Sequence, residues 1–212
     1  MMRISFLLAF FIAGIAVNGQ RKFTGGLLVG PLFSQISGDG LGGWDKLGVG
    51  GGGWVGVPIS DKNTISMSMK YVTKGSRSKR DTLDFNSFAF HLNYIDVPIL
   101  FEREFRLGNS RMSWSIGPYI GILLSQKAKV NGVDYGVSEA SQGAPFEPLD
   151  IGAMGALTGW VGERIFIQYS LSTSLLPTRP APLVVNQNSY YEQGNYNQTM
   201  QLMFGLRFGK TD

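Results

Sequence analysis

Few side chains in this sequence are of a type that could carry acid–base or metal chemistry. The 212 residues include no cysteine and a single histidine, His91. This composition excludes disulfides, thiolate metal sites, cysteine nucleophiles and every site that needs several histidines. His91 could act as the base of a hydrolase, but its neighbours predict a hydrogen-bonded interior histidine instead. We therefore expect no catalytic residue, no metal site and no bound cofactor, and we predict that the chain is not an enzyme.

Glycine spacing produces two matches to the dinucleotide-binding pattern, at residues 38–43 and 48–53. Neither match opens a segment with helical periodicity, so no helix N-terminus would meet a pyrophosphate. We interpret residues 48–53 as part of a strand that bends sharply or packs closely, where missing side chains help.

The elements that would position any site begin after an N-terminal leader. A basic start ending at Arg3 precedes an apolar run at residues 4–17, and small residues lead to Gln20, the layout of a secretory signal peptide. We predict a signal peptide at residues 1–19, cleaved before Gln20, and one domain at residues 20–212; an uncleaved anchor helix is the alternative. No later stretch is long and apolar enough for a transmembrane helix. The formal net charge of +4 is too small to imply a nucleic-acid partner.

The rest of the chain repeats segments in which large apolar side chains alternate with serine, glycine or isolated charges. Such alternation is typical of two-faced strands. The clearest segment places Ile165, Ile167 and Tyr169 on one face and Phe166, Gln168 on the other. The eight expected strands are 22–33, 47–57, 65–71, 88–101, 112–125, 149–161, 164–176 and 198–208.

Connections between these segments alternate in length. Short turns are expected at residues 58–63, 106–111 and 159–164, and longer polar connections at 34–46, 76–86, 127–148 and 177–197. An even number of strands with this alternation, after a signal peptide, is typical of an outer-membrane barrel. The fold class that we predict is all-β, an eight-stranded antiparallel up-and-down transmembrane β-barrel. A soluble lipocalin-like barrel is disfavoured, because serine and glycine cannot cover a soluble exterior; aromatics of a soluble sandwich core are the other alternative.

Charged residues on the small-residue face are expected inside the barrel. At residues 88–101 the large apolar set changes parity after Tyr94, which predicts a bulge between Tyr94 and Pro98 that keeps both sets outward and turns His91, Asn93 and Asp96 inward. Unpaired charges in a narrow lumen are costly. We therefore predict a structural polar network in the lumen, formed by Lys70, His91, Asp96, Asp150 and Arg207; a translocation pathway is the alternative. The other expected lumen fillers are Trp54, Tyr119, Met154 and Gln168.

One basic cluster follows the expected third strand and consists of Lys74, Arg77, Lys79 and Arg80. In a long outer loop, such a cluster is suited to contact the phosphates of lipopolysaccharide. A merely solvated loop is the alternative, because Asp81 and Asp84 follow directly.

Three short motifs resemble a known family. They are Tyr94-Ile95-Asp96-Val97-Pro98-Ile99-Leu100, Gly117-Pro118-Tyr119-Ile120-Gly121 and Gly205-Leu206-Arg207-Phe208-Gly209. They resemble the outer-membrane β-barrel domain family of Gram-negative bacteria, including porin-family and PorT-like proteins. The resemblance implies an integral outer-membrane barrel without catalytic residues, and some members serve a protein secretion and gliding system.

We therefore expect an integral protein of the cell outer membrane with a structural or accessory role, such as that of a subunit of a larger envelope or protein secretion assembly. Its expected partners are outer-membrane lipid, lipopolysaccharide and larger envelope proteins. Transport of a small or hydrophobic solute is the alternative function, and lipid modification by an enzyme at the barrel rim is a third.

Overall fold

A computed structural model describes residues 23–41, 43–78, 87–138, 144–180 and 194–208. The expected signal peptide at residues 1–19 lies outside this part of the chain. Among the described residues, no helix has the length and apolar character needed to cross a membrane.

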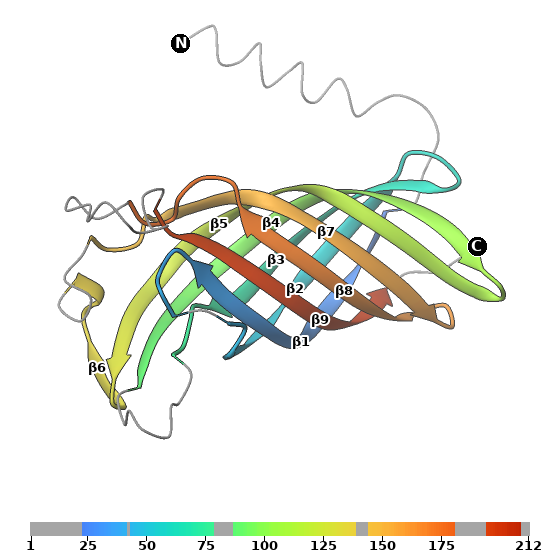
Figure 1. Cartoon of the computed structure of the whole chain (residues 1–212). Coiled ribbons are helices and arrows are strands. Elements are labelled where there is room, and N and C mark those ends of the chain that lie inside the picture. The colour runs from blue at the N-terminus through green and yellow to red at the C-terminus, as the bar shows by residue number, and fades with distance from the viewer. Residues whose placement is uncertain (1–22, 42, 79–86, 139–143, 181–193, 209–212) are drawn as a thin grey trace, which may run out of the picture.

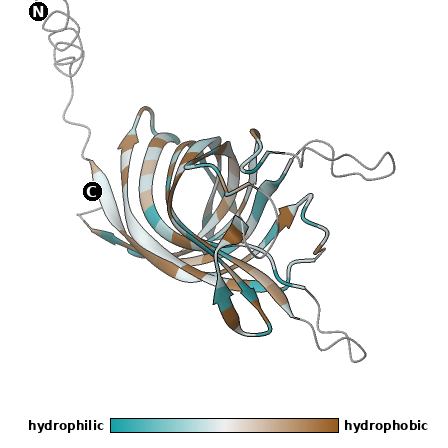
Figure 2. Cartoon of the chain, turned by 90° about the vertical axis from the view of Figure 1, so that its left-hand side faces the viewer, coloured by the Kyte–Doolittle hydropathy of each residue, from teal (hydrophilic) through white to brown (hydrophobic). Residues whose placement is uncertain are grey.

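The described residues form one antiparallel sheet that closes on itself (Figures 1 and 2). Its order is β4-β3-β2-β1-β9-β8-β7-β5-β6, and a further pairing of β4 with β5 closes the ring. The strands are β1 (Thr24–Ser37), β2 (Lys46–Pro58), β3 (Asn63–Lys74), β4 (Phe88–Leu107), β5 (Ser110–Val130), β6 (Val133–Tyr135), β7 (Leu149–Val161), β8 (Ile165–Ser174) and β9 (Tyr196–Phe208). The predicted eight-stranded antiparallel barrel is confirmed, with eight long strands in the ring. The short β6 was not predicted and pairs with the end of β5.

The two ends of the barrel differ in their connections. At one end, tight turns join β4 to β5 and β7 to β8 through Gly108 and Gly162, whose φ angles are +59° and +73°. At the other end, longer connections follow β1, β3 and β8, and β6 lies there too (Figure 1). We call these the short-turn end and the long-loop end.

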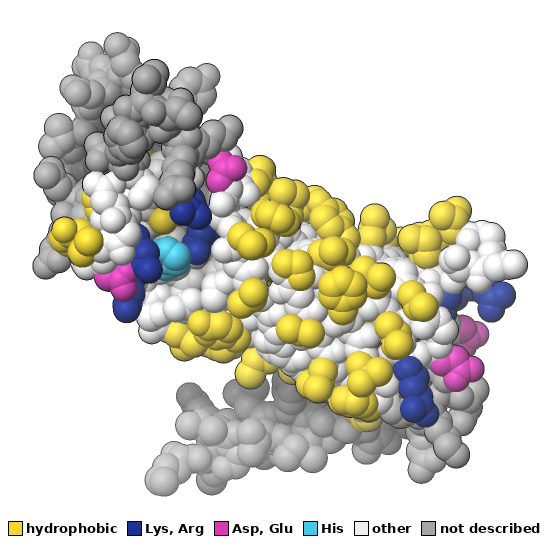
Figure 3. Space-filling model, turned by 90° about the horizontal axis from the view of Figure 1, so that it is seen from below, with side chains coloured by type: hydrophobic (Ala, Val, Ile, Leu, Met, Phe, Trp, Pro, Cys, Tyr) yellow, Lys and Arg dark blue, Asp and Glu magenta, His cyan; other side chains and the backbone are white. Residues whose placement is uncertain are grey.

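The outer face of the barrel carries a belt of large apolar side chains. Yellow side chains cover much of the surface between the two ends in Figure 3. The belt follows from the alternation in each strand, because residues of one parity point outward. It includes Leu27, Val29, Val55, Met67, Met69, Ile99, Ile116, Ile120, Ile122, Leu157, Ile167, Leu171, Leu202 and Phe204, all exposed. A belt of this kind is suited to lipid and not to water.

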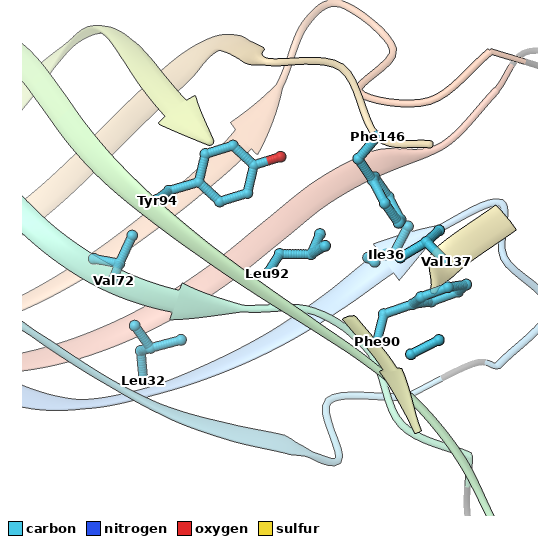
Figure 4. Close-up of a cluster of buried hydrophobic side chains, with 9 residues drawn as sticks. Leu32, Ile36, Val72, Phe90, Leu92, Tyr94, Val137 and Phe146 are labelled. Carbon is cyan, nitrogen blue, oxygen red and sulfur yellow. The ribbon is translucent and has the colours of Figure 1, made fainter. Parts of the chain in front are cut away.

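On β4, toward the long-loop end, the large apolar side chains point inward. Phe90, Leu92 and Tyr94 of β4 are buried inside the barrel together with Leu32 and Val72 (Figure 4). Phe146 and Val137, from the connection between β5 and β7, pack on the same cluster. The cluster fills the barrel interior above the belt, as the core of a soluble barrel does.

This apolar cluster corrects one prediction about residues 88–101. Phe90, Leu92, Tyr94 and Asp96 are all buried, so β4 keeps one parity and contains no parity change. The register shift between Asn93 and Tyr94 arises on β5 instead, where Asn93 pairs with Ser125 and Tyr94 pairs with Leu123. Leu124 is therefore the extra residue of a β-bulge.

Candidate functional site

A buried ion-pair cluster crosses the lumen next to the apolar cluster, and the Tyr94 ring contacts both. The ammonium group of Lys74, at the end of β3, lies 2.9 Å from Oδ1 of Asp96 and 3.1 Å from Oδ2 of Asp150. All three side chains are fully buried. The ammonium also lies over the rings of Tyr94 and Tyr119, 4.7 and 4.9 Å from their centroids. One cation therefore holds together two carboxylates from β4 and β7, and rings from β4 and β5 surround it.

Neutral donors complete the shell of Asp150. The hydroxyl of Tyr119 donates to Oδ1 at 3.0 Å and that of Ser174 at 2.7 Å. The side-chain amide of Asn197 donates to Oδ2 at 3.0 Å. These contacts join β5, β8 and β9 to Asp150 on β7. Together with Lys74, these donors give both carboxylate oxygens of the buried Asp150 hydrogen-bond partners.

A second group of polar side chains lies next to this cluster. Lys70 is buried on β3 and donates to Oε1 of Gln201 at 2.9 Å. The Gln201 amide donates to the hydroxyl of Thr199, which is hydrogen-bonded to Ser172. Lys70 therefore forms a hydrogen bond across the lumen to Gln201 of β9 and does not line an open channel.

Gly121 on β5 makes room for the ion-pair cluster. A Cβ at this position would lie 2.8 Å from Oδ1 of Asp96 and 3.2 Å from both Cβ of Asp150 and a ring carbon of Tyr94. These distances are shorter than ordinary van der Waals contacts. Only glycine at this position lets the two carboxylates and the tyrosine ring approach as they do.

The short-turn half of the lumen holds a small cavity. About 40 Å³ of free space lies among side chains that include Lys70, Trp54, Glu102, Trp160 and Phe166. This volume accommodates only a few water molecules. The rings of Trp54 and Phe166 meet edge to face with centroids 5.6 Å apart. Aromatic side chains therefore fill this half of the barrel.

The predicted lumen residues do not all meet. Lys70, Asp96 and Asp150 lie inside, and Lys70 pairs with Asp96 in the β3–β4 ladder. Arg207 lies near the short-turn end, with its guanidinium 5.6 Å from the centre of the Trp160 ring and apart from the ion-pair cluster. The prediction that His91 lies in the lumen with Asp96 is wrong. His91 has the opposite parity on β4 and is partly exposed on the outer face.

The predicted basic loop cluster also needs correction. Lys74 does not belong to a loop, because β3 continues to this residue and its side chain is fully buried against Asp96 and Asp150. Arg77 is exposed at the long-loop end. Lys79 and Arg80 lie outside the described residues. A signal for the interior position of Lys74 was present in the sequence, since Lys70 and Lys74 share one strand parity.

The arrangement of charged groups offers little for catalysis. Within the described ranges, no group of three histidine or carboxylate side chains is close enough to hold a metal ion. Asp150 accepts hydrogen bonds from Lys74 and from hydroxyl and amide donors, and Asp96 is held by its ion pair with Lys74. His91 contacts Lys46, with Nζ 2.9 Å from Nδ1, a pairing of a base with a cation instead of with a nucleophile.

Comparison with known families decides what kind of barrel this is. A family model described as an outer membrane protein beta-barrel domain matches residues 10–179. The chain belongs to this outer-membrane β-barrel family. It is therefore an integral protein of the outer membrane, with its apolar belt in the bilayer. The narrower PorT-like relationship stays a prediction. Since bacterial barrels of this kind turn their short connections to the periplasm, we call the short-turn end periplasmic and the long-loop end extracellular.

Solved structures similar to this chain are also outer-membrane barrels. The attachment invasion locus protein Ail of Yersinia pestis, in complex with the heparin analogue sucrose octasulfate, is 13% identical, with a TM-score of 0.45, over 88% of this chain and 99% of that chain. Neisserial surface protein A is 13% identical, with a TM-score of 0.43, over 87% and 95% of the two chains. OprG from Pseudomonas aeruginosa is 12% identical, with a TM-score of 0.40, over 89% and 95%. A search of curated protein sequences found no match.

Proposed function

We propose that this barrel has a structural or accessory role in the outer membrane and does not transport solutes. The observation that carries the proposal is the ion-pair cluster across the lumen, in which Lys74 holds Asp96 and Asp150 together. Separating these charges within the barrel is costly because the surrounding dielectric is low. Phe90 and Leu92 lie on β4 between Asp96 and the long-loop end, and their apolar cluster adds a second barrier.

A route through the wall for a hydrophobic solute has no support either. Each of the eight long strands pairs with a neighbour on both sides, and the β4–β5 pairs that close the ring run from Phe88 to Leu107 with an interruption at Ile99 and Leu100. The lumen cavity of about 40 Å³ is smaller than a solute of even modest size. Within the part of the chain that the structure describes, the alternative function, transport of a small or hydrophobic solute, therefore has neither an open channel nor a pocket of solute size.

The test is conductance in a planar lipid bilayer. Purified full-length protein is reconstituted at moderate salt, and single-channel events are counted as protein is added. We expect no stable steps. A matched variant, F90A/L92A, thins the apolar cluster but retains the ion pairs, so it should also stay closed. Stable steps from the wild-type protein that scale with its amount would replace this proposal with the transport function.

The accessory role implies a partner among larger envelope proteins. Purification of the tagged chain from its native membrane in mild detergent, after crosslinking in intact cells, should recover a defined envelope protein in fixed ratio. Recovery of the chain alone, at several crosslinker lengths, would argue for a self-sufficient structural protein.

A further inference from the structure

A hollow of about 340 Å³ lies at the extracellular end of the barrel, beside the end of β3. Its outward lining includes Thr73, His91, Asn93, Lys127, Lys129 and Asp134, and the buried side chains of Lys46, Lys74 and Leu92 also line it. Figure 3 shows the single cyan histidine surrounded by dark blue side chains at this end of the molecule, with a magenta side chain beside them. The residues come from five strands, β2 to β6. We call this hollow the basic pocket.

The basic pocket has an excess of positive charge. Lys46 donates to Nδ1 of His91 at 2.9 Å. Asp134 lies 3.5 Å from Nζ of Lys127 and 3.4 Å from Nζ of Lys129, so one carboxylate is shared between two lysines. Arg77 adds a further positive charge that acts on both Lys46 and His91. Lys74, which also lines the pocket, is neutralised by Asp96 and Asp150. Among the described residues here, Lys46, Lys127, Lys129 and the nearby Arg77 therefore outnumber the single carboxylate of Asp134.

The ionisation of the pocket reflects this excess. Burial, followed by the positive charges of Lys46 and Lys129, lowers the pKa of His91 below its ordinary value of 6.5. Burial and the charges of Arg77 and Lys129 lower the pKa of Lys46 as well. A bound anion would relieve this repulsion, because an opposite charge favours the protonated form of both groups.

The height of the pocket on the barrel indicates the source of the anion. Along the outward parity of β4, Ile95 belongs to the apolar surface, and the next two outward residues are Asn93 and His91. Asn93 lies only about 7 Å along the strand from Ile95, given a rise of about 3.4 Å per residue. On the paired strand, Ile122 and Leu124 are followed by Ser125 and Lys127. The pocket therefore adjoins the apolar belt directly, at the level of lipid headgroups.

Polar uncharged donors complete the pocket. The amide of Asn93 donates to the hydroxyl of Ser125 at 2.7 Å, next to the lysines of β5. Lysine ammonium groups and such donors suit phosphate oxygens. Below them, Ile95, Ile122 and Leu124 present apolar surface to an acyl chain. One molecule that carries both a phosphate and acyl chains would satisfy both parts.

We propose that the basic pocket binds the phosphate groups of a phosphorylated glycolipid in the outer leaflet, the chemistry of lipopolysaccharide, while the acyl chains of that lipid lie on the apolar belt below. The predicted lipopolysaccharide contact is thereby moved from Lys74, which is buried, to Lys46, Lys127 and Lys129, and Arg77 is retained. This binding does not depend on whether the lumen is closed, so it stands apart from the proposed function.

The experiment uses His91 as a reporter. It is the only histidine in the chain, so a histidine-labelled sample in lipid nanodiscs gives the signals of one imidazole. Its pKa is measured by NMR titration in phosphatidylcholine nanodiscs and in the same nanodiscs containing purified lipopolysaccharide. We expect lipopolysaccharide to raise the pKa of His91. No change on adding lipopolysaccharide would overturn the proposal.

Two pairs of substitutions locate the site. K127Q/K129Q removes two exposed lysines from the pocket and should weaken lipopolysaccharide binding about tenfold or more, since each basic residue near a charged surface contributes measurably. K62Q/R164Q removes two exposed charges at the periplasmic end and should leave binding unchanged. Equal weakening by both variants would show a nonspecific charge effect and overturn the proposal. The readout is the change in the pKa of His91 on adding lipid, because loss of Lys129 alone also raises this pKa.

Two further arms distinguish the ligand source and protect against a folding artefact. D134N removes the competing carboxylate and should tighten lipopolysaccharide binding severalfold, an effect that a damaged fold would not produce; weaker binding would count against the pocket. Inorganic phosphate, at the phosphate concentration supplied by lipopolysaccharide, should leave the pKa of His91 unchanged. If free phosphate reproduced the full effect, the pocket would be a general anion site and the assignment to a lipid would be wrong.

Discussion

Lys74 and Asp150 lie 3.1 Å apart although β3 and β7 are three strands apart around the ring. The contact crosses the lumen, and Asp96 lies on the same ammonium group. The pair therefore acts as a crosslink inside a barrel whose wall is otherwise held by neighbouring strands. Its strength depends on all three charges being present together, because a buried ion that loses its partner is penalised heavily.

We predict that K74M strongly destabilises the barrel. The substitution leaves Asp96 and Asp150 close together without a cation, and loss of one partner of a buried pair costs about 3 to 5 kcal/mol. The triple variant K74M/D96N/D150N removes every charge and should recover most of this loss. The free energy of unfolding, from urea titration of protein reconstituted in lipid vesicles, measures both. A triple variant no more stable than K74M would contradict this account.

A methyl group at position 121 should also disturb the cluster. G121A places a carbon 2.8 Å from Oδ1 of Asp96, so the carboxylate must move away from Lys74. Overpacking of this kind costs about 1 to 3 kcal/mol. The control is G159A, because no atom lies within 4 Å of a Cβ built there. Equal unfolding free energies for the two variants, in the same urea titration, would argue against the tight fit of Gly121.

The apolar belt predicts where an arginine is tolerated. Leu171 is 48% exposed on the outer face of β8, so L171R faces the bilayer and should cost about 2 to 4 kcal/mol. Ser37 is exposed at the extracellular end of β1, and S37R should cost about 1 kcal/mol or less. The yield of folded barrel after refolding into vesicles compares the two. Normal folding and insertion of L171R would show that the assigned strand parity is wrong.

The orientation of the barrel can be tested with inserted epitopes. Gly132, in the turn between β5 and β6, and Gly108, in the turn between β4 and β5, both have positive φ angles and open space around them. An epitope after Gly132 should be stained by antibody on intact cells. One after Gly108 should be stained only after permeabilisation. The reverse result would exchange the extracellular and periplasmic ends.

Much of the wall of this barrel could be predicted from the sequence, because alternation is a local signal. The outward face of β8 can be predicted from Ile165, Ile167 and Tyr169 alone, without information from any other strand. The same holds for the short turns, where glycine adopts positive φ angles. The interior positions of Lys70, Asp96 and Asp150 followed from the same parity rule applied to the opposite face.

Errors arose where the surroundings of the barrel change along a strand. The apolar belt faces lipid, but above it the barrel stands in water, so Phe90 and Leu92 turn inward and His91 outward. A rule that points every large apolar residue at lipid fails there. The pairing of Asp150 with Lys74 could not be predicted from the sequence, because only the closed ring brings the end of β3 near β7.

The extra residue Leu124 decides which side chains after it on β5 point outward, so a one-codon change at this position has a large effect. Before it on β5, odd-numbered residues such as Tyr119 and Gly121 point inward; after it, Lys127 and Lys129 point outward and Ala128 fills the interior. Loss of this one codon would exchange the lysines with Ala128 without altering the strands inside the bilayer. A single insertion or deletion at the bulge therefore changes which side chains the extracellular rim presents, while the earlier part of β5 keeps its inward and outward faces.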